Sequence, residues 1–98
     1  MKVIFIDALH QKVEEKEIPA GIKSIQKTIG CSIFTAPWIY NTPNNSALYV
    51  DDEGIYNSEY RGFYFKGQQL FGNGVIVGDD DLDCDVNIED VKVSFWGR

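Results

Sequence analysis

Hydrophobic positions along this chain fall into short runs separated by turn residues, a pattern typical of a domain built largely from strands. Residues 2–7 are β-branched and aromatic, which predicts a central strand. Residues 12–18 alternate loosely between polar and apolar, and their charges suit an edge strand that must not pair with another chain. The segment Pro19-Ala20-Gly21 ends this second strand.

The strongest helical pattern covers residues 22–29. Ile22, Ile25 and Ile29 recur at i, i+3 and i+7 and therefore share one face, while lysines and a glutamine occupy the other. Gly30 stands where helices commonly end in a left-handed C-cap. A helix this short persists only when it packs against the rest of the protein, so we expect its isoleucine face to lie on the sheet.

The middle of the chain predicts a hairpin over residues 31–50. Residues 31–40 are apolar and β-prone, although Pro37 interrupts them. Residues 41–45, Asn-Thr-Pro-Asn-Asn, are the clearest turn signal in the chain. Residues 47–50 then predict the returning strand.

The second half of the chain is less regular. Residues 55–70 are rich in aromatic side chains but lack a clean period, so they are assigned to no element. Residues 72–74 predict a turn, and residues 75–77 predict a short buried strand. Residues 87–96 fit a helix or a strand, and the pattern narrowly favours a short helical turn that runs into an extended end.

These elements predict an α+β fold in one domain, residues 1–98, with a small, mostly antiparallel sheet and the helix 22–29 packed on it. A chain of this length buries only about two thirds of its unfolded surface, so the core is small. We expect that core to contain Val3, Phe5, Ile25, Ile29, Ile33, Leu48, Val50, Val75, Val77 and Val91.

The net charge of −6 restricts the classes of partner that we expect this protein to bind. A protein that binds nucleic acid usually presents a basic surface to the phosphates, so direct binding of DNA or RNA is not expected. The acidic excess has three readings: solubility, a docking face for a basic partner, or mimicry of a nucleic-acid backbone.

Acidic residues are concentrated near the C-terminus, since no Lys or Arg occurs from Gly67 to Val91. Calcium binding in an EF-hand loop that begins at Asp79 would need Gly and Glu where Cys84 and Asp90 stand, so that pattern fails. The stretch is then either a solvated loop or a patch that docks a basic protein surface. As a patch, its candidate residues are Asp79, Asp80, Asp81, Asp83 and Asp85.

Aromatic residues gather in the middle of the chain beside two cations. Aromatic rings next to a guanidinium could stack a base and hold a phosphate, form a protein-binding hot spot, or simply build the core. For a nucleotide-like ligand, the candidate residues are Trp38, Tyr40, Tyr56, Tyr60, Arg61, Tyr64 and Lys66.

Catalysis finds little support in the sequence. A zinc site usually needs three or four His or Cys ligands, and the chain offers only His10, Cys31 and Cys84, far apart in sequence. A Cys–His nucleophile pair stays possible in principle, but Cys31 follows the predicted helix and does not stand at a helix N-terminus that would lower its pKa. No glycine-rich phosphate loop is present. We therefore expect no enzymatic activity, no cofactor and no metal. The two cysteines suit reduced thiols of a cytoplasmic protein, and we expect neither a secretory signal nor a membrane span.

Four segments in order resemble the domain of unknown function 3846, a family of small phage and mobile-element proteins. They are Met-Lys-Val-Ile at 1–4, Ser-Ile-Gln-Lys-Thr-Ile-Gly at 24–30, Leu-Tyr-Val-Asp-Asp-Glu-Gly at 48–54 and Gly-Asn-Gly-Val-Ile-Val-Gly-Asp-Asp at 72–80. The resemblance covers about residues 1–95, but residues 57–61 lack the proline of the family's corresponding segment. It implies a phage-type accessory protein in a bacterial cytoplasm and favours a role in counter-defence.

The expected function is therefore stoichiometric binding that inhibits a host bacterial protein through the acidic stretch. Two alternatives stay open. One is a non-catalytic sponge that sequesters a nucleotide-derived immune signal through the aromatic segment. The other is a structural or interaction protein with no inhibitory role. The sequence also leaves open whether the protein forms a homo-oligomer.

Overall fold

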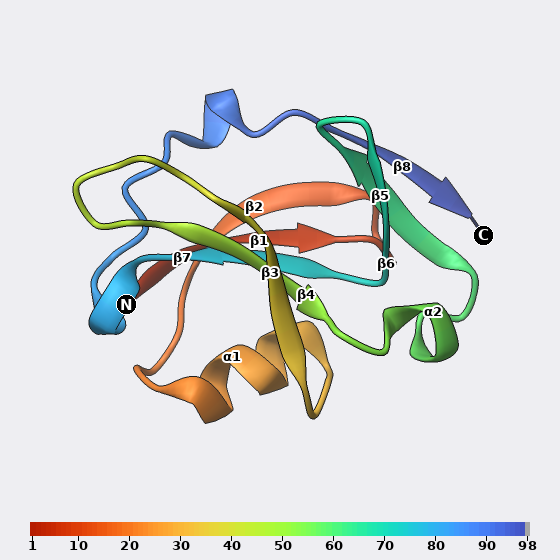
Figure 1. The fold of residues 1–98 in the computed structure, drawn as a ribbon, viewed down its shortest axis with the longest axis horizontal. Coiled ribbons are helices and arrows are strands. Elements are labelled where there is room, and N and C mark those ends of the chain that lie inside the picture. Colours follow the sequence, from red (N-terminus) through yellow and green to blue (C-terminus); the bar gives the residue numbers. More distant parts are fainter. Residues whose placement is uncertain (98) are drawn as a thin grey trace.

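A computed structural model describes residues 1–97, which form two antiparallel sheets and one main helix (Figure 1). The larger sheet has the strand order β2-β1-β7-β4-β3. Its strands are β1 (Lys2–Asp7), β2 (Lys12–Glu17), β3 (Phe34–Ile39), β4 (Ala47–Asp51) and β7 (Gly74–Val77). The predicted α+β fold is confirmed.

The smaller sheet has the order β6-β5-β8 and was not predicted as a separate layer. Its strands are β5 (Arg61–Phe65), β6 (Gln68–Phe71) and β8 (Val93–Gly97). Gly62 in β5 pairs with Trp96 in β8, and a Cβ atom on Gly62 would lie 2.8 Å from the indole. The same Cβ atom would clash first with the backbone carbonyl of Leu70, which cannot move aside as a side chain can, and this explains a glycine inside the strand.

The helix α1 (Ile22–Ile29) ends as the sequence predicts. Gly30 has a φ of 85° in the left-handed region, and its backbone N–H donates to the carbonyl of Gln26. The remaining helical pieces are short: α2 (Gly54–Asn57) and the 3-10 turns η1 (Asp79–Asp81) and η2 (Ile88–Asp90). Because η2 precedes β8, the helical turn followed by an extended end is confirmed for residues 87–96.

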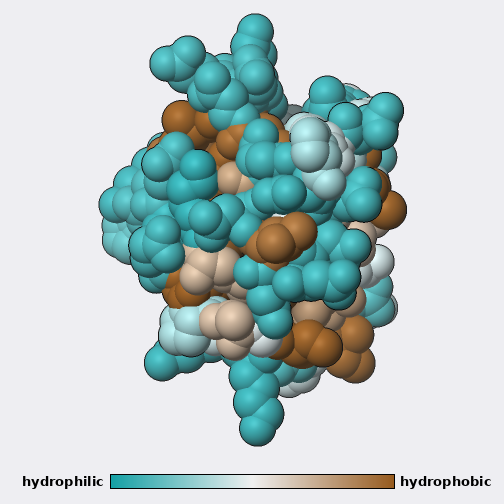
Figure 2. Space-filling model, turned by 90° about the vertical axis from the view of Figure 1, so that its left-hand side faces the viewer, coloured by the Kyte–Doolittle hydropathy of each residue, from teal (hydrophilic) through white to brown (hydrophobic). Residues whose placement is uncertain are grey.

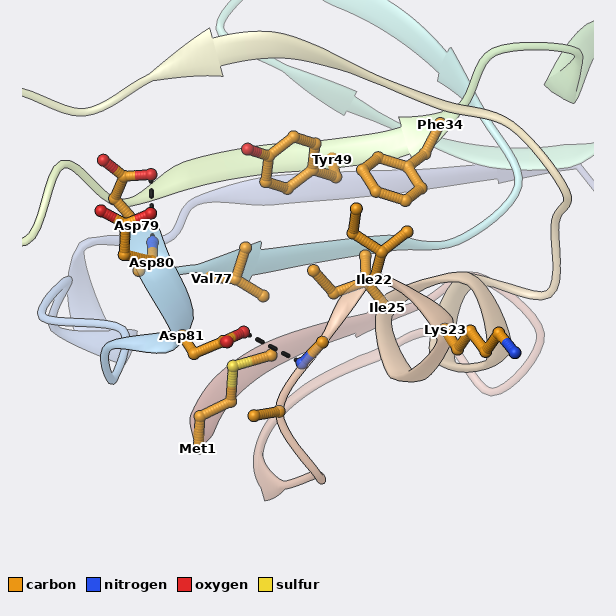
Figure 3. A pocket seen from close by; sticks show the side chains of 13 residues that line it. Met1, Ile22, Lys23, Ile25, Phe34, Tyr49, Val77, Asp79, Asp80 and Asp81 are labelled. Carbon is orange, nitrogen blue, oxygen red and sulfur yellow. Dashed lines mark hydrogen bonds between the residues drawn. The ribbon is translucent and has the colours of Figure 1, made fainter.

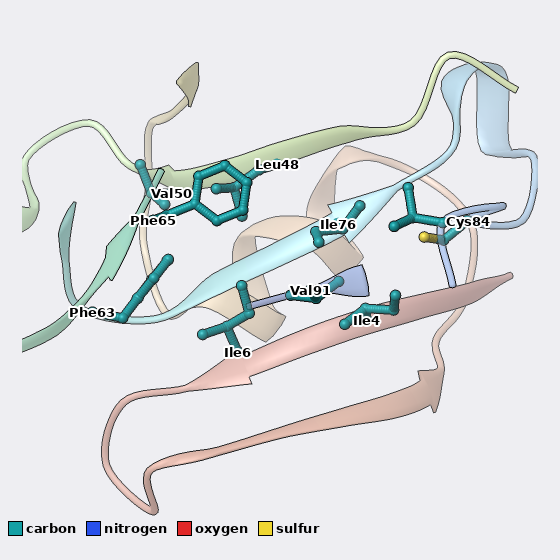
Figure 4. Packing of buried hydrophobic residues seen from close by; sticks show 10 residues of the cluster. Ile4, Ile6, Leu48, Val50, Phe63, Phe65, Ile76, Cys84 and Val91 are labelled. Carbon is teal, nitrogen blue, oxygen red and sulfur yellow. The ribbon is translucent and has the colours of Figure 1, made fainter. Parts of the chain in front are cut away.

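The two faces of the larger sheet carry separate clusters of buried side chains. On one face, Ile25 and Ile29 of α1 pack on Val3, Val75 and Val77. On the other face, the smaller sheet contributes Phe63 and Phe65 (Figure 4). They pack with Ile4, Ile6, Leu48, Val50, Ile76, Cys84, Val86 and Val91. The larger sheet is therefore the middle layer of a three-layer domain, and β1, buried along most of its length, is central as predicted.

The local predictions hold with two corrections. Residues 12–17 form an edge strand, and β3 pairs with β4 as the predicted hairpin, with an irregular register around Pro37. Ile33 was expected in the core, but it precedes β3 and its side chain is 56% exposed, so that prediction is wrong. Ile22 was placed on the buried helix face, yet it is 65% exposed because the first turn of α1 overhangs an open cleft.

Candidate functional site

A cleft lies between the N-terminal turn of α1 and the β3–β4 side of the larger sheet (Figure 3). It has a volume of about 720 Å³. Ile25 and Val77 lie at its base, and Phe34 and Tyr49 face Ile22 across it. The rings of Phe34 and Tyr49 meet edge to face with centroids 5.0 Å apart. We call this site the acidic cleft, because η1 closes one end of it.

The turn η1 is tied to the helix by a side-chain contact. Asp81 Oδ1 accepts a hydrogen bond of 2.9 Å from the backbone N–H of Gly21, the residue that precedes α1. A carboxylate at a helix N-terminus is favourable because the helix dipole is positive there. Asp79 Oδ1 accepts from the N–H of Asp80 at 3.1 Å. These contacts place three consecutive aspartates at the end of an apolar cleft.

Asp83 and Asp85, predicted as members of the same patch, hold the chain together instead of facing the cleft. Asp83 Oδ1 accepts a 2.7 Å hydrogen bond from the backbone N–H of Lys2. Asp85 accepts from Thr42 Oγ1 at 2.7 Å, from the N–H of Asn44 at 2.8 Å and from Ser46 Oγ at 2.6 Å. The Ser46 hydrogen bond is the largest of several causes that lower the pKa of Asp85 to about 2.

A second cleft, on the other side of α1, was missed by the sequence reasoning. It has a volume of about 480 Å³ and lies between α1 and the end of β2. We call it the basic cleft, because its lining contains three lysines and none of the described lining residues is Asp or Glu. The lining residues are Lys16, Ile18, Pro19, Lys23, Ser24, Lys27 and Thr28. The spacing of Lys23 and Lys27 was visible in the sequence, but the approach of Lys16 depends on the fold.

The predicted aromatic ligand site is divided by the structure. Lys66 Nζ lies 4.7 Å above the ring of Trp38, beyond the last residue of β5. Arg61 is the first residue of β5 and lines a separate cleft of about 180 Å³. Five residue steps of about 3.3 Å each separate the backbones of the two cations, so the structure does not bring them together in one cleft.

The tyrosines of that predicted site are also separated. Tyr40 is half-buried against Phe65, with ring centroids 6.4 Å apart. Burial, followed by the charge of Cys84, raises the pKa of Tyr40 to about 12. Tyr64 is 45% exposed on β5, while Tyr56 and Tyr60, in and just after α2, are 85% and 75% exposed. Part of the aromatic segment therefore builds the core, and the rest is spread over the surface.

Comparison with known proteins places the chain in a family. The family model described as domain of unknown function DUF3846 matches residues 1–95. The chain belongs to this family. No curated protein and no solved structure matches the DUF3846 chain. The family is one of unknown function, so functional inference rests on the two clefts.

The histidine and cysteines of this DUF3846 protein lie apart from the clefts' charged rims. His10 Nδ1 lies 2.7 Å from Asp7 Oδ2 in an exposed turn. Cys31 is half-buried, and burial followed by the Asp51 charge raises the pKa of its thiol to about 11. Cys84 is buried, and burial raises its thiol pKa as well. Both thiols are therefore poor nucleophiles near neutral pH.

Residues 1–97 contain no cluster of metal-binding side chains and no membrane-spanning helix. No group of three or more His, Cys, Asp or Glu residues in this part of the chain is placed to hold a metal ion. No helix there has the length and apolar character needed to cross a bilayer.

Proposed function

We propose that this DUF3846 protein acts by stoichiometric binding and that the acidic cleft receives a segment of a partner protein. The occupant we propose carries Lys or Arg beside a large apolar side chain. The observation that supports this choice is that one cleft of about 720 Å³ contains both an apolar base and, at its end, three consecutive aspartates.

The apolar part of the cleft supplies the attraction that is independent of charge. Ile22 is 65% exposed, and Phe34 and Tyr49 are only partly buried. Covering apolar surface contributes about 25 cal/mol per Å², and interface hot spots are small apolar centres surrounded by polar residues. On the face that Figure 2 presents, hydrophilic side chains surround small, separate apolar patches.

The acidic part of the cleft supplies charge selectivity. Asp79 and Asp80 are exposed, and neither forms an ion pair with any residue in the described part of the chain. A cationic side chain of the partner would meet two uncompensated carboxylates, which speeds association and makes it sensitive to salt. An anionic segment would be repelled by the same two groups.

The partner we propose is a protein of the bacterial host whose activity is inhibited by the binding. The resemblance of the chain to proteins of phages and mobile elements makes host proteins the first partners to test. The exposed surface that lines the cleft is smaller in area than a standard interface, which covers about 800 Å² on each protein. The cleft would therefore form the centre of a larger contact.

Affinity capture from bacterial lysate at low salt tests the proposal when variants are compared. Asp79→Asn together with Asp80→Asn removes two charges from the cleft but keeps the Oδ1 acceptors. Asp52→Asn together with Glu53→Gln removes two exposed carboxylates elsewhere and is the matched control. We expect a host protein that is captured by the wild type and the control and is lost with the cleft variant. A captured set that is the same for all three proteins would contradict the proposal.

A further inference from the structure

We propose that the basic cleft is a binding site for a small anionic ligand that carries two or more phosphate groups. This site goes beyond the proposed function: it borders the acidic cleft at Lys23, which lines both, but the rest of its lining is separate. Its volume of about 480 Å³ is within the range of small-molecule sites, about 300 to 1,000 Å³.

The charge around the basic cleft is the reverse of that of the whole protein. The chain has nine Lys and Arg residues against fifteen Asp and Glu, yet three of the nine line this one cleft. Lys16 enters from β2, where it pairs with Val3 and lies over the ring of Phe5 at 4.8 Å. Lys23 and Lys27 enter from α1. Three lysines from two elements therefore line one concave surface.

The neighbouring carboxylates of β2 are engaged elsewhere. Glu14 Oε2 lies 3.4 Å from Lys12 Nζ, and Glu17 Oε2 lies 3.5 Å from the N-terminal amino group. Glu15 pairs with Ile4, one position off the Val3–Lys16 pair, so it points to the other face of the sheet. Within residues 1–97, none of the three cleft lysines has a carboxylate within ion-pair distance.

The arrangement is unfavourable for the helix itself. Lys23 is the second residue of α1, where the helix dipole disfavours a cation, and α1 has no acidic residue in its first turn. Lys23 and Lys27 are four residues apart, so their like charges repel each other. An anion bound between the lysines would relieve both effects, which is the stabilisation expected of a ligand site.

The hydroxyl groups of the cleft also suit an anion. Thr28 Oγ1 donates its proton to the backbone carbonyl of Ser24 at 2.7 Å. The Ser24 hydroxyl lines the cleft without a hydrogen bond to any described residue, so its proton is available to a phosphate oxygen. Lysine ammonium groups serve as point charges for phosphate, and such charge-assisted hydrogen bonds are stronger than neutral ones.

Calorimetric titration with inorganic tripolyphosphate and with ADP tests this site, with amide NMR shifts to locate it. We expect both probes to bind and to shift the amide signals of Ser24, Lys27 and Thr28. Lys27→Gln is the principal variant because Lys23 also lines the acidic cleft. We expect it to weaken binding about tenfold, the effect of losing one charge-assisted hydrogen bond.

Lys92→Gln is the matched control, since Lys92 is exposed and does not line the basic cleft. It should leave the affinity for tripolyphosphate unchanged. Equal weakening by both variants, or no binding by the wild type, would overturn the proposal. Binding of a short single-stranded oligonucleotide without binding of ADP would overturn the assignment to a small ligand. The cleft variant Asp79→Asn with Asp80→Asn should not weaken phosphate binding, so failures of the two proposals are distinguishable.

Discussion

Ser46 and Asp85, 39 positions apart, exchange two hydrogen bonds. Ser46 Oγ donates to Asp85 Oδ1 at 2.6 Å, and the backbone N–H of Asp85 donates to Ser46 Oγ at 3.2 Å. Ser46 is fully buried directly before β4, while Asp85 follows the acidic turn η1. This pair therefore holds the segment that follows η1, the acidic end of the cleft, against the larger sheet.

The substitution Ser46→Ala should destabilise the protein by about 1 to 3 kcal/mol, because the backbone N–H and the carboxylate of Asp85 each lose a hydrogen-bond partner. Urea denaturation measures the free energy of unfolding. Ser94→Ala, on an exposed position of β8, is the control and should change the stability by less than about 0.5 kcal/mol. Equal stability of the Ser46 and Ser94 variants would show that the pair does not fasten this segment.

The same pair predicts how stability depends on pH. The pKa of Asp85 is lowered from its ordinary value of 3.8 to about 2, so its ionised form is favoured in the folded state. The stabilisation that it supplies is complete above about pH 4 and is lost as the pH falls through about 2. Asp7 contributes in the same direction: burial raises its pKa, but hydrogen bonds and the charge of His10 outweigh burial and lower it.

Unfolding measured at several pH values should therefore show stability decreasing between about pH 4 and pH 2. The Ser46→Ala variant should lose less over this range, because the Ser46 hydrogen bond is the main cause that lowers the pKa of Asp85. The difference in unfolding free energy between wild type and variant should thus shrink in acid. A difference that stays constant from pH 4 to pH 2 would contradict the assignment.

Replacement of Phe63 tests whether the two sheets fold as one unit. Phe63 comes from β5 of the smaller sheet, is fully buried and packs with Ile6 and Leu48 of the larger one. Phe63→Ala should cost about 3 to 5 kcal/mol. Because both sheets share this cluster, circular dichroism and tryptophan fluorescence should report one coincident transition at lower denaturant. Separate transitions for the two probes would show that the sheets unfold independently.

The sequence correctly predicted those helices, strands and turns that are determined by residues close together in the chain. The β-branched run of β1, the isoleucine spacing of α1 with its Gly30 cap, and the turn before β4 each act over a few residues. The smaller sheet was missed because β5 pairs with β8, about thirty positions away, and the aromatic residues of β5 show no period that reveals this pairing. Arg61 and Lys66 looked adjacent in the sequence, but an extended strand holds them apart.

The clefts were only partly predictable for the same reason. The aspartates of the acidic cleft were singled out by charge, but their place beside α1 depends on the contact between Asp81 and Gly21, 60 positions apart. Nothing in the local sequence separates Asp85, which fastens the chain, from Asp80, which is exposed. The basic cleft exists because the connection after β2 folds α1 back beside Lys16.

Site-specific photo-crosslinking tests the central claim, that the acidic cleft receives a basic and apolar segment of a host protein. A photoreactive phenylalanine analogue replaces Ile22, which is exposed on the cleft, or Ser94 on β8 as the control. After irradiation in bacterial lysate, we predict an adduct from position 22 that maps to a segment containing Lys or Arg. Its yield should fall when Asp79→Asn and Asp80→Asn are added. Equal adducts from positions 22 and 94, or an adduct at a segment without Lys or Arg, would contradict the claim.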